Sequence, residues 1–235
     1  MHNRVVVVGV PRSGTTFFTN QFRTDQREYT GEINNPHSRF YFSKGSLTAA
    51  KLPEYDETAY LENFEVLKLC NKPYVTKVIL QQYTRDIADD IMKQIDSLNP
   101  DLLIYCKRDL IDTLISLNNS SATNIWNINE YSLKSTVIPK VDVDWILPDY
   151  VITTYYDIKR KWDRWARTTK NVVSKTYTNN MLDVHRQWLL DCQVDIIRPS
   201  TVKVSSIEDY QNNISIKYSI EEVRAHIKRV IGDYR

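Results

Sequence analysis

Residues 5–16 read VVVVGVPRSGTT and carry the strongest structural signal of the chain. The four consecutive β-branched residues from Val5 to Val8 predict a buried strand. Gly9 and Gly14 bound a turn rich in backbone N–H groups, and the Phe-containing segment 15–22 predicts a helix directly after it. Unpaired N–H groups and the positive end of the helix dipole converge at such a turn, so this stretch predicts a phosphate site.

The turn differs from the general phosphate loop at one position. That loop reads G-x-x-x-x-G-K-[ST], and here Thr15 stands in place of the lysine while Arg12 puts a cation inside the turn. A loop without the lysine is poorly suited to a pair of β- and γ-phosphates bound with magnesium. It still suits a single phosphate with a guanidinium beside it.

A second strand and helix carry another basic group. Residues 102–107 predict a buried strand, which leads into Arg108 and a helix expected over 109–119. Ser116 follows Arg108 by eight residues, or about two helical turns. A guanidinium presents a planar fork of donors that suits a phosphate, and Ser116 adds a hydroxyl.

Together the two motifs resemble the sulfotransferases that use 3′-phosphoadenosine 5′-phosphosulfate (PAPS). That family reads P-[KR]-S-G-T-T after its first strand, and its 3′-phosphate element has an arginine followed eight residues later by a serine, as Arg108 and Ser116 are here. The resemblance implies that Arg108 and Ser116 bind the 3′-phosphate and that the loop binds the 5′-phosphosulfate. The loop residues implied as cofactor ligands are Pro11, Arg12, Ser13, Gly14, Thr15 and Thr16.

The resemblance also implies catalytic roles. Arg12 is expected to stabilise the leaving phosphate. Gly31-Glu32 resembles the Gly-Glu of the arginine-loop branch, which includes protein-tyrosine sulfotransferases, and this makes Glu32 the candidate general base. His37 is the rival base, because cytosolic small-molecule sulfotransferases use a histidine. Lys77, in a strand expected over 73–79, is a further candidate for orienting the acceptor or the base.

Two weaker matches lie near the end of the sequence. Residues 201–210 resemble the family's late strand and Tyr-Glu-Asp element, with Ile207 in the place of the tyrosine. Residues 229–235 resemble its Arg-…-Gly-Asp-Trp-Lys segment, with Tyr234 in the place of the tryptophan. The second match makes Arg229 a further candidate for binding the cofactor.

Composition argues against several other classes of protein. A net charge of +2 gives no strong case for nucleic-acid binding. The 3 cysteines are far apart, which argues against a zinc site or a disulfide framework, and sulfuryl transfer itself is expected to need no metal. No window approaches about 20 apolar residues, and the first strand is expected near Val5. We therefore expect no membrane partner, no transmembrane helix or signal peptide, and a cytoplasmic location.

Strand and helix signals alternate along the chain, with a less regular stretch at 25–56. Strands are expected at 4–9, 73–79, 102–107 and 201–204, and helices at 14–24, 57–69, 84–97, 109–119, 153–172, 178–192 and 219–230. The pattern predicts an α/β fold of the P-loop type, with a central parallel sheet flanked by helices, in a single domain over 1–235. Residues from about 120 to 150 are expected to form an excursion on the acceptor side.

The leading interpretation is therefore a PAPS-dependent sulfotransferase. It would transfer a sulfuryl group to an acceptor hydroxyl or amine and release adenosine 3′,5′-bisphosphate. A P-loop nucleotide kinase and a noncatalytic nucleotide-binding module are the alternatives. The sequence leaves open whether the acceptor is a small molecule, a carbohydrate or a peptide hydroxyl, and it does not indicate the oligomeric state.

Overall fold

The chain is divided into two compact units. The first combines Met1–Arg108 with Asp157–Ile197, and the second combines Asp109–Tyr156 with Arg198–Arg235. The computed structural model describes residues 2–44, 46–56, 58–81, 86–123, 141–143, 145–178, 180–194, 214–216 and 218–234. The single domain expected from the sequence stays a prediction, and each unit is described by itself.

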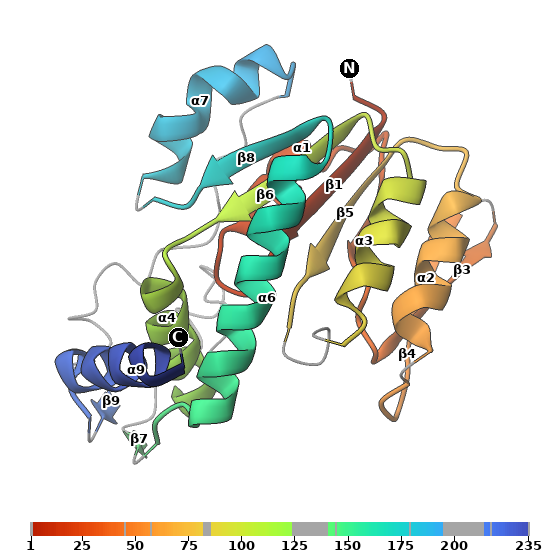
Figure 1. Cartoon of the computed structure of the whole chain (residues 1–235). Helices are drawn as coiled ribbons and strands as arrows, with labels where there is room; N and C mark the ends of the chain where they lie inside the picture. The colour runs from red at the N-terminus through yellow and green to blue at the C-terminus, as the bar shows by residue number, and fades with distance from the viewer. Residues whose placement is uncertain are drawn as a thin grey trace. The chain divides into compact units, whose positions relative to one another are not determined.

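The first unit is built on a five-stranded sheet with the strand order β2-β5-β1-β6-β8 (Figure 1). The strands are β1 (Arg4–Gly9), β2 (Glu28–Glu32), β5 (Tyr74–Ile79), β6 (Leu102–Lys107) and β8 (Val172–Thr176). Every pairing between neighbouring strands is parallel. The expected parallel sheet of an α/β fold is therefore confirmed, and ligands of such sheets bind at the carboxyl ends of the strands.

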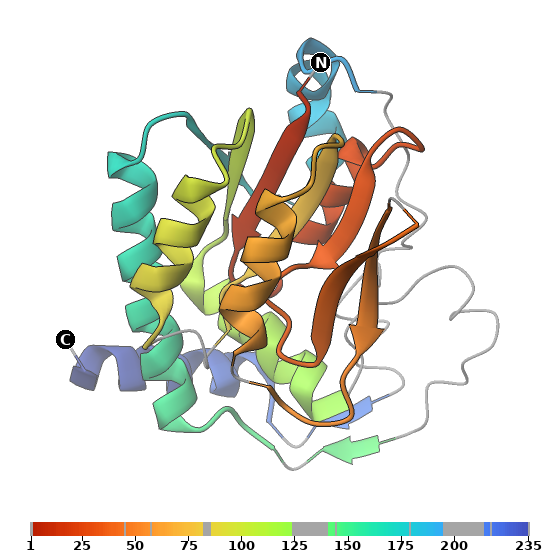
Figure 2. The same cartoon turned by 90° about the vertical axis from the view of Figure 1, so that its right-hand side faces the viewer.

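Helices cover both faces of this sheet (Figures 1 and 2). On one face lie α1 (Thr15–Phe22) and α7 (Met181–Asp191), whose apolar residues share a core with β1 and β6. On the other lie α3 (Ala88–Ser97) and the part of α6 (Asp149–Thr168) that begins at Asp157. α2 (Ala59–Lys68) packs on α3. The first unit is thus a three-layer α/β/α arrangement.

β1 is the centre of this core. Val5 to Val8 are fully buried, as their β-branched run predicted. Val5 and Val7 pack with Phe18 and Phe22 of α1, so the strand and the helix that follow each other in sequence also share one apolar cluster. Burying each of these side chains contributes about 1.5–3 kcal/mol, which fixes the turn between them on a rigid base.

Two parts of the first unit differ from the sequence prediction. The stretch 25–56, expected to be less regular, contains β2 and an antiparallel hairpin of β3 (Ser38–Ser43) and β4 (Ser46–Lys51). The helix expected to continue to residue 172 ends at Thr168, and β8 follows it. Asn171 adopts a left-handed backbone with φ 65°, which asparagine tolerates and which turns the chain into the β-branched strand.

The second unit contains α4 (Leu110–Thr123), the start of α6, and α9 (Ile220–Tyr234), with short parallel strands β7 (Val141–Val143) and β9 (Ile214–Ile216). α4 packs on α9, and Arg224 pairs with Asp112 across them at 3.3 Å. The predicted strand 201–204 and most of the excursion expected at about 120–150 lie outside the described residues.

The remaining predicted strands and helices occur with ends shifted by a few residues. Among the helices of the described ranges, none combines the length and the apolar run required to cross a bilayer.

Candidate functional site

The turn between β1 and α1 has the backbone of an anion-binding loop. Arg12 and Gly14 both adopt left-handed conformations, with φ 67° and 91°. The buried Ser13 holds the turn closed, because its Oγ donates a hydrogen bond to the Val10 carbonyl at 2.6 Å. Gly14 occupies the N-cap of α1, and no side chain of the described residues caps that helix start. The first N–H groups of α1 therefore suit an anion.

Close packing leaves no room for a side chain at either glycine of this loop. A Cβ at Gly9 would lie 2.4 Å from Ser13 Oγ and 3.1 Å from the Cβ of the buried Cys106. A Cβ at Gly14 would lie 2.9 Å from the ring of Tyr177. The loop is thus shaped by close approach of its neighbours as well as by its own backbone.

Gly9→Ala is expected to lower the free energy of unfolding by about 1–3 kcal/mol, because the added methyl overfills a closed core. Urea denaturation measures the loss. Gly232→Ala is the matched control: Gly232 lies in α9, and a Cβ there meets nothing within 4 Å. Replacing a helical glycine in open space stabilises by about 0.5–1 kcal/mol, so the two substitutions should act in opposite directions. Equal effects would contradict the packing argument.

Arg108, at the end of β6, reaches the loop directly. Its Nη1 donates a hydrogen bond to the backbone carbonyl of Arg12 at 2.7 Å. Its guanidinium also stacks 4.4 Å above the ring of Tyr177. The structure therefore brings together the two arginine segments that the sequence singled out, and it adds an aromatic ring to them.

Tyr177 is a site residue that the sequence analysis missed. It directly follows β8, and its backbone N–H donates to the carbonyl of Lys107 at 2.6 Å. Because residue 172 was expected to be the end of a helix, no strand was predicted beside β6. Tyr177, which follows that strand, was therefore not identified. The run Val-Val-Ser-Lys-Thr-Tyr after Asn171 was the available signal, since β-branched residues bounded by a turn former favour a strand.

An irregularity in β2 sets the direction of the Glu32 side chain. The pairing of β2 with β5 shifts between Tyr29 and Gly31, and Gly31 has φ 67°. Such bulges redirect the following side chain. Glu32 is half-buried and lies opposite Lys77, and its Oε1 accepts a hydrogen bond from Gln81 Nε2 at 2.9 Å. Burial raises the pKa of Glu32, and Lys77 and Gln81 oppose that rise.

Lys77 lies between this carboxylate and the start of α1, which follows the turn after β1. Its Nζ lies 3.5 Å from Thr16 Oγ1, at the outer limit for a hydrogen bond. The same ammonium attracts Glu32, which pairs with it in the register of β2 and β5. A cation, a candidate base and the last hydroxyl of the loop therefore meet at the strand ends.

His37 is placed differently from Glu32. It is exposed, and its ring lies edge-on to Tyr55 with the ring centres 6.0 Å apart. Within the described part of the chain, no contact joins it to Glu32 or to the loop. The geometry therefore gives Glu32 the better position for base chemistry at the loop.

Ser116 and Arg229 belong to the second unit. Ser116 is half-buried on α4, and its carbonyl accepts a bond from Ser120 Oγ at 2.9 Å. Arg229 pairs with Asp149 at 3.8 Å and with Asp233 at 3.5 Å. Their expected contacts with a 3′-phosphate stay predictions.

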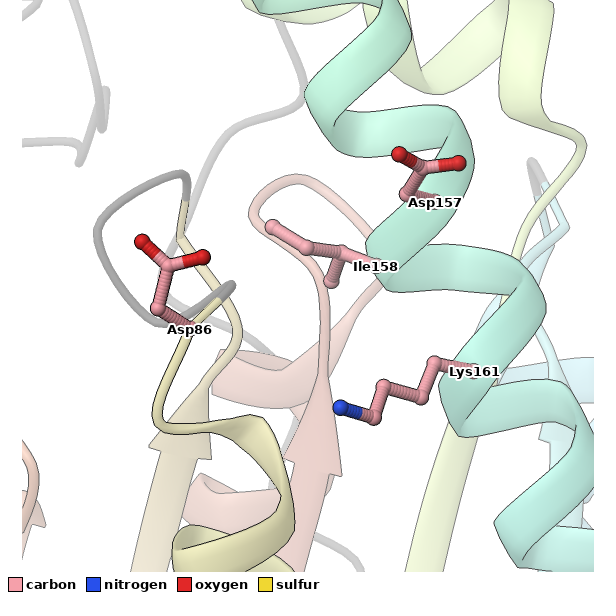
Figure 3. Close-up of a pocket in the computed structure, with 4 residues that line it drawn as sticks. All are labelled: Asp86, Asp157, Ile158 and Lys161. Carbon is pink, nitrogen blue, oxygen red and sulfur yellow. The ribbon is translucent and has the colours of Figure 1, made fainter.

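A cavity of about 340 Å³ lies elsewhere in the first unit. Figure 3 shows Asp86, from the segment before α3, facing Asp157, Ile158 and Lys161 of α6. Lys161 also pairs with Asp89 at 2.9 Å. None of the residues predicted for the site lines this cavity. The described ranges also contain no group of three or more His, Cys, Asp or Glu side chains arranged to hold a metal ion.

Comparison with known proteins finds similarity at the level of structure. No family model matches the chain, and no curated protein matches its sequence. Among solved structures, the crystal structure of mouse sulfotransferase SULT7A1 complexed with PAP is similar, with 15% sequence identity and a TM-score of 0.44. The likeness covers 89% of this chain and 66%, just under two thirds, of that chain. The residues of the site therefore carry the functional conclusion.

Proposed function

We propose that this chain is a sulfotransferase that transfers a sulfuryl group from PAPS to an acceptor hydroxyl or amine. The observation that carries the proposal is the contact between two basic phosphate elements at neighbouring strand ends. Arg108 touches the backbone of the loop that holds Arg12. A nucleotide with phosphates on both its 3′ and 5′ positions offers one group to each element, which ordinary mononucleotides do not.

The loop suits the 5′ end of such a nucleotide. Its N–H groups and the start of α1 favour one phosphate, and Arg12 adds a guanidinium beside it. Because Thr15 stands in place of the phosphate-loop lysine, a triphosphate with magnesium lacks its usual partner there. In the proposal, Pro11 to Thr16 hold the phosphosulfate and Arg108 holds the 3′-phosphate. Ser116 and Arg229 belong to the second unit, and their binding of a 3′-phosphate stays a prediction from the sequence.

Transfer requires one bond to form and one to break at sulfur. The acceptor oxygen or nitrogen attacks the sulfur, and the bond between sulfur and the 5′-phosphate oxygen breaks. Arg12 stabilises the charge that develops on that oxygen. Glu32 takes the acceptor proton, and Lys77 lies between the carboxylate and the loop. No step demands a metal. The acceptor class (small molecule, carbohydrate or peptide) and the cytoplasmic location stay predictions.

Nucleotide binding tests this proposal. Adenosine 3′,5′-bisphosphate is expected to raise the thermal midpoint and to bind at least about tenfold more tightly than adenosine 5′-monophosphate, because the 3′-phosphate adds a charge-assisted contact. ATP with magnesium should stabilise the protein less. Calorimetry and thermal denaturation measure both effects. Preferential binding of ATP with magnesium would instead support the kinase.

Arg108→Met and Lys107→Met form a matched pair for the same assay. Arg108→Met is expected to remove the preference for the 3′-phosphorylated nucleotide, and Lys107→Met, one residue earlier at the end of β6, is expected to keep it. The ratio of the two affinities is the useful quantity, because any loosening of the loop on losing Arg108 affects both nucleotides. Turnover of PAPS with a panel of acceptors then separates an enzyme from a noncatalytic binding module.

A further inference from the structure

Gln81 stands at a fixed place at the ends of the central strands. The N–H of Leu80 donates to the carbonyl of Gly9 at 3.0 Å, which ties the segment after β5 to the end of β1. The N–H of Gln81 then donates to the carbonyl of Ile79 at 3.2 Å, in a tight three-residue turn. The backbone of Gln81 is therefore held just where the phosphate loop begins.

We propose that Gln81 is a positioning residue that holds the Glu32 carboxylate in the orientation required to remove the acceptor proton; the inference rests on the proposed function. Its Nε2 donates to Glu32 Oε1 at 2.9 Å. An N–H donor bonds more strongly to an ionised carboxylate than to the neutral acid, so this contact favours the form that acts as a base. The bond occupies one oxygen, and we assign the acceptor proton to the other, Oε2.

A neutral amide suits this task because Glu32 already has a cation beside it. Within the described residues, Lys77 on β5 is the charged group that acts on Glu32, while β4, which also packs on β2, carries the exposed Lys51 at its end. A second cation at position 81 would favour ionisation so strongly that the carboxylate became a weak base. An amide fixes the direction of the carboxylate without adding charge.

Gln81→Met tests the inference, since it keeps the length of the side chain and removes the donor. The acid limb of the kcat/KM profile is expected to move upward by about one pH unit, because the ionised form of Glu32 loses a hydrogen bond. We expect kcat to fall about tenfold through loss of orientation, with the KM for PAPS unchanged. A carbon-13 NMR titration of the Glu32 carboxyl should show the same upward shift independently of turnover.

Gln81→Glu provides a second variant. It places another carboxyl group beside Glu32, so the pair would share a proton and the shift should exceed that of Gln81→Met. Asn34→Ala is the control. Asn34, two residues after β2, also ties its segment to β5 by an amide, donating to the Ile79 carbonyl at 2.9 Å and accepting from the Ile79 N–H at 3.1 Å. Its loss should lower the thermal midpoint without moving the acid limb.

The outcomes separate the two proposals. If the unmodified protein transfers sulfuryl groups and Gln81→Met changes neither the acid limb nor the NMR titration, the inference about Gln81 is wrong and the proposed function stands. If the unmodified protein transfers no sulfuryl group to any acceptor, the proposed function fails and the catalytic inference fails with it. If the acid limb and the NMR titration both shift upward in Gln81→Met, the result supports the proposed function and the inference about Gln81.

Discussion

Replacing Arg12 with glycine should slow sulfuryl transfer by about two to three orders of magnitude and, at the same time, stabilise the fold. Arg12 has φ 67°, a left-handed conformation that costs a non-glycine residue about 1–2 kcal/mol. Glycine adopts it freely, so Arg12→Gly keeps the loop backbone and relieves that cost. It also removes the cation beside the leaving phosphate, and loss of one such group lowers kcat by about 10²–10³-fold. Urea denaturation and single-turnover transfer measure the two effects.

Two further substitutions control this prediction. Lys44→Gly changes another left-handed residue, with φ 50°, in the turn of the β3–β4 hairpin. It should give a comparable gain in stability and leave transfer unchanged. Arg12→Ala removes the same guanidinium but keeps the left-handed strain, so it should lose transfer without becoming more stable. If Arg12→Gly kept near-normal turnover, Arg12 would have no role in stabilising the leaving group.

The combination of strain and chemistry explains why an arginine occupies this position. A glycine would be the easier residue for the backbone, yet the turn carries a long basic side chain. Strained residues concentrate at sites where function requires a particular side chain. The same residue offers its carbonyl to Arg108, so the conformation of Arg12 also sets where the second arginine lies. The backbone of the turn that carries Arg12 therefore helps to position Arg108.

The turn between β1 and α1 was predictable because its determinants are local. The strand of β-branched residues, the two glycines and the following helix lie within one short stretch, and their contacts are with each other. The strand before Arg108 was predictable for the same reason: β6 is buried from Leu102 to Cys106. Two such strands with helices between them indicate a parallel sheet, and the structure confirms it.

The partners of Glu32 and Arg108 were not predictable in the same way. Gln81 follows its strand without any motif, and it meets Glu32 only because β2 and β5 are neighbours in a particular register. The position of Tyr177 depends on β8, a short edge strand that contains polar residues. The helix pattern before this strand was extended into it, so the strand was not predicted. The family resemblance identified His37 as a rival base, whereas the exposure of its ring is a property of the folded chain.

Glu32→Gln should lower kcat by about 10²–10⁴-fold while leaving the fold and the binding of adenosine 3′,5′-bisphosphate intact. The amide keeps the shape of the side chain, and its carbonyl oxygen can still accept from Gln81. Burial raises the pKa of Glu32 above its ordinary value, so transfer by the unmodified protein is expected to fall as pH drops through that raised pKa. The variant should lack this acid limb. Stopped-flow transfer measured across pH tests both effects.

The same pKa shift predicts how stability depends on pH. Because the folded state holds the Glu32 proton more tightly than the unfolded state, its contribution to stability is fully present below the ordinary pKa and is lost as pH rises through the raised one. Glu32→Gln should remove this dependence. Glu28→Gln is the matched control, since Glu28 lies on the same strand but pairs with Lys72 at 3.2 Å. It should leave both the rate and the acid limb unchanged. Loss of the limb in His37→Gln, together with its persistence in Glu32→Gln, would transfer the base role to His37 and show that a buried carboxylate beside the loop serves the fold alone.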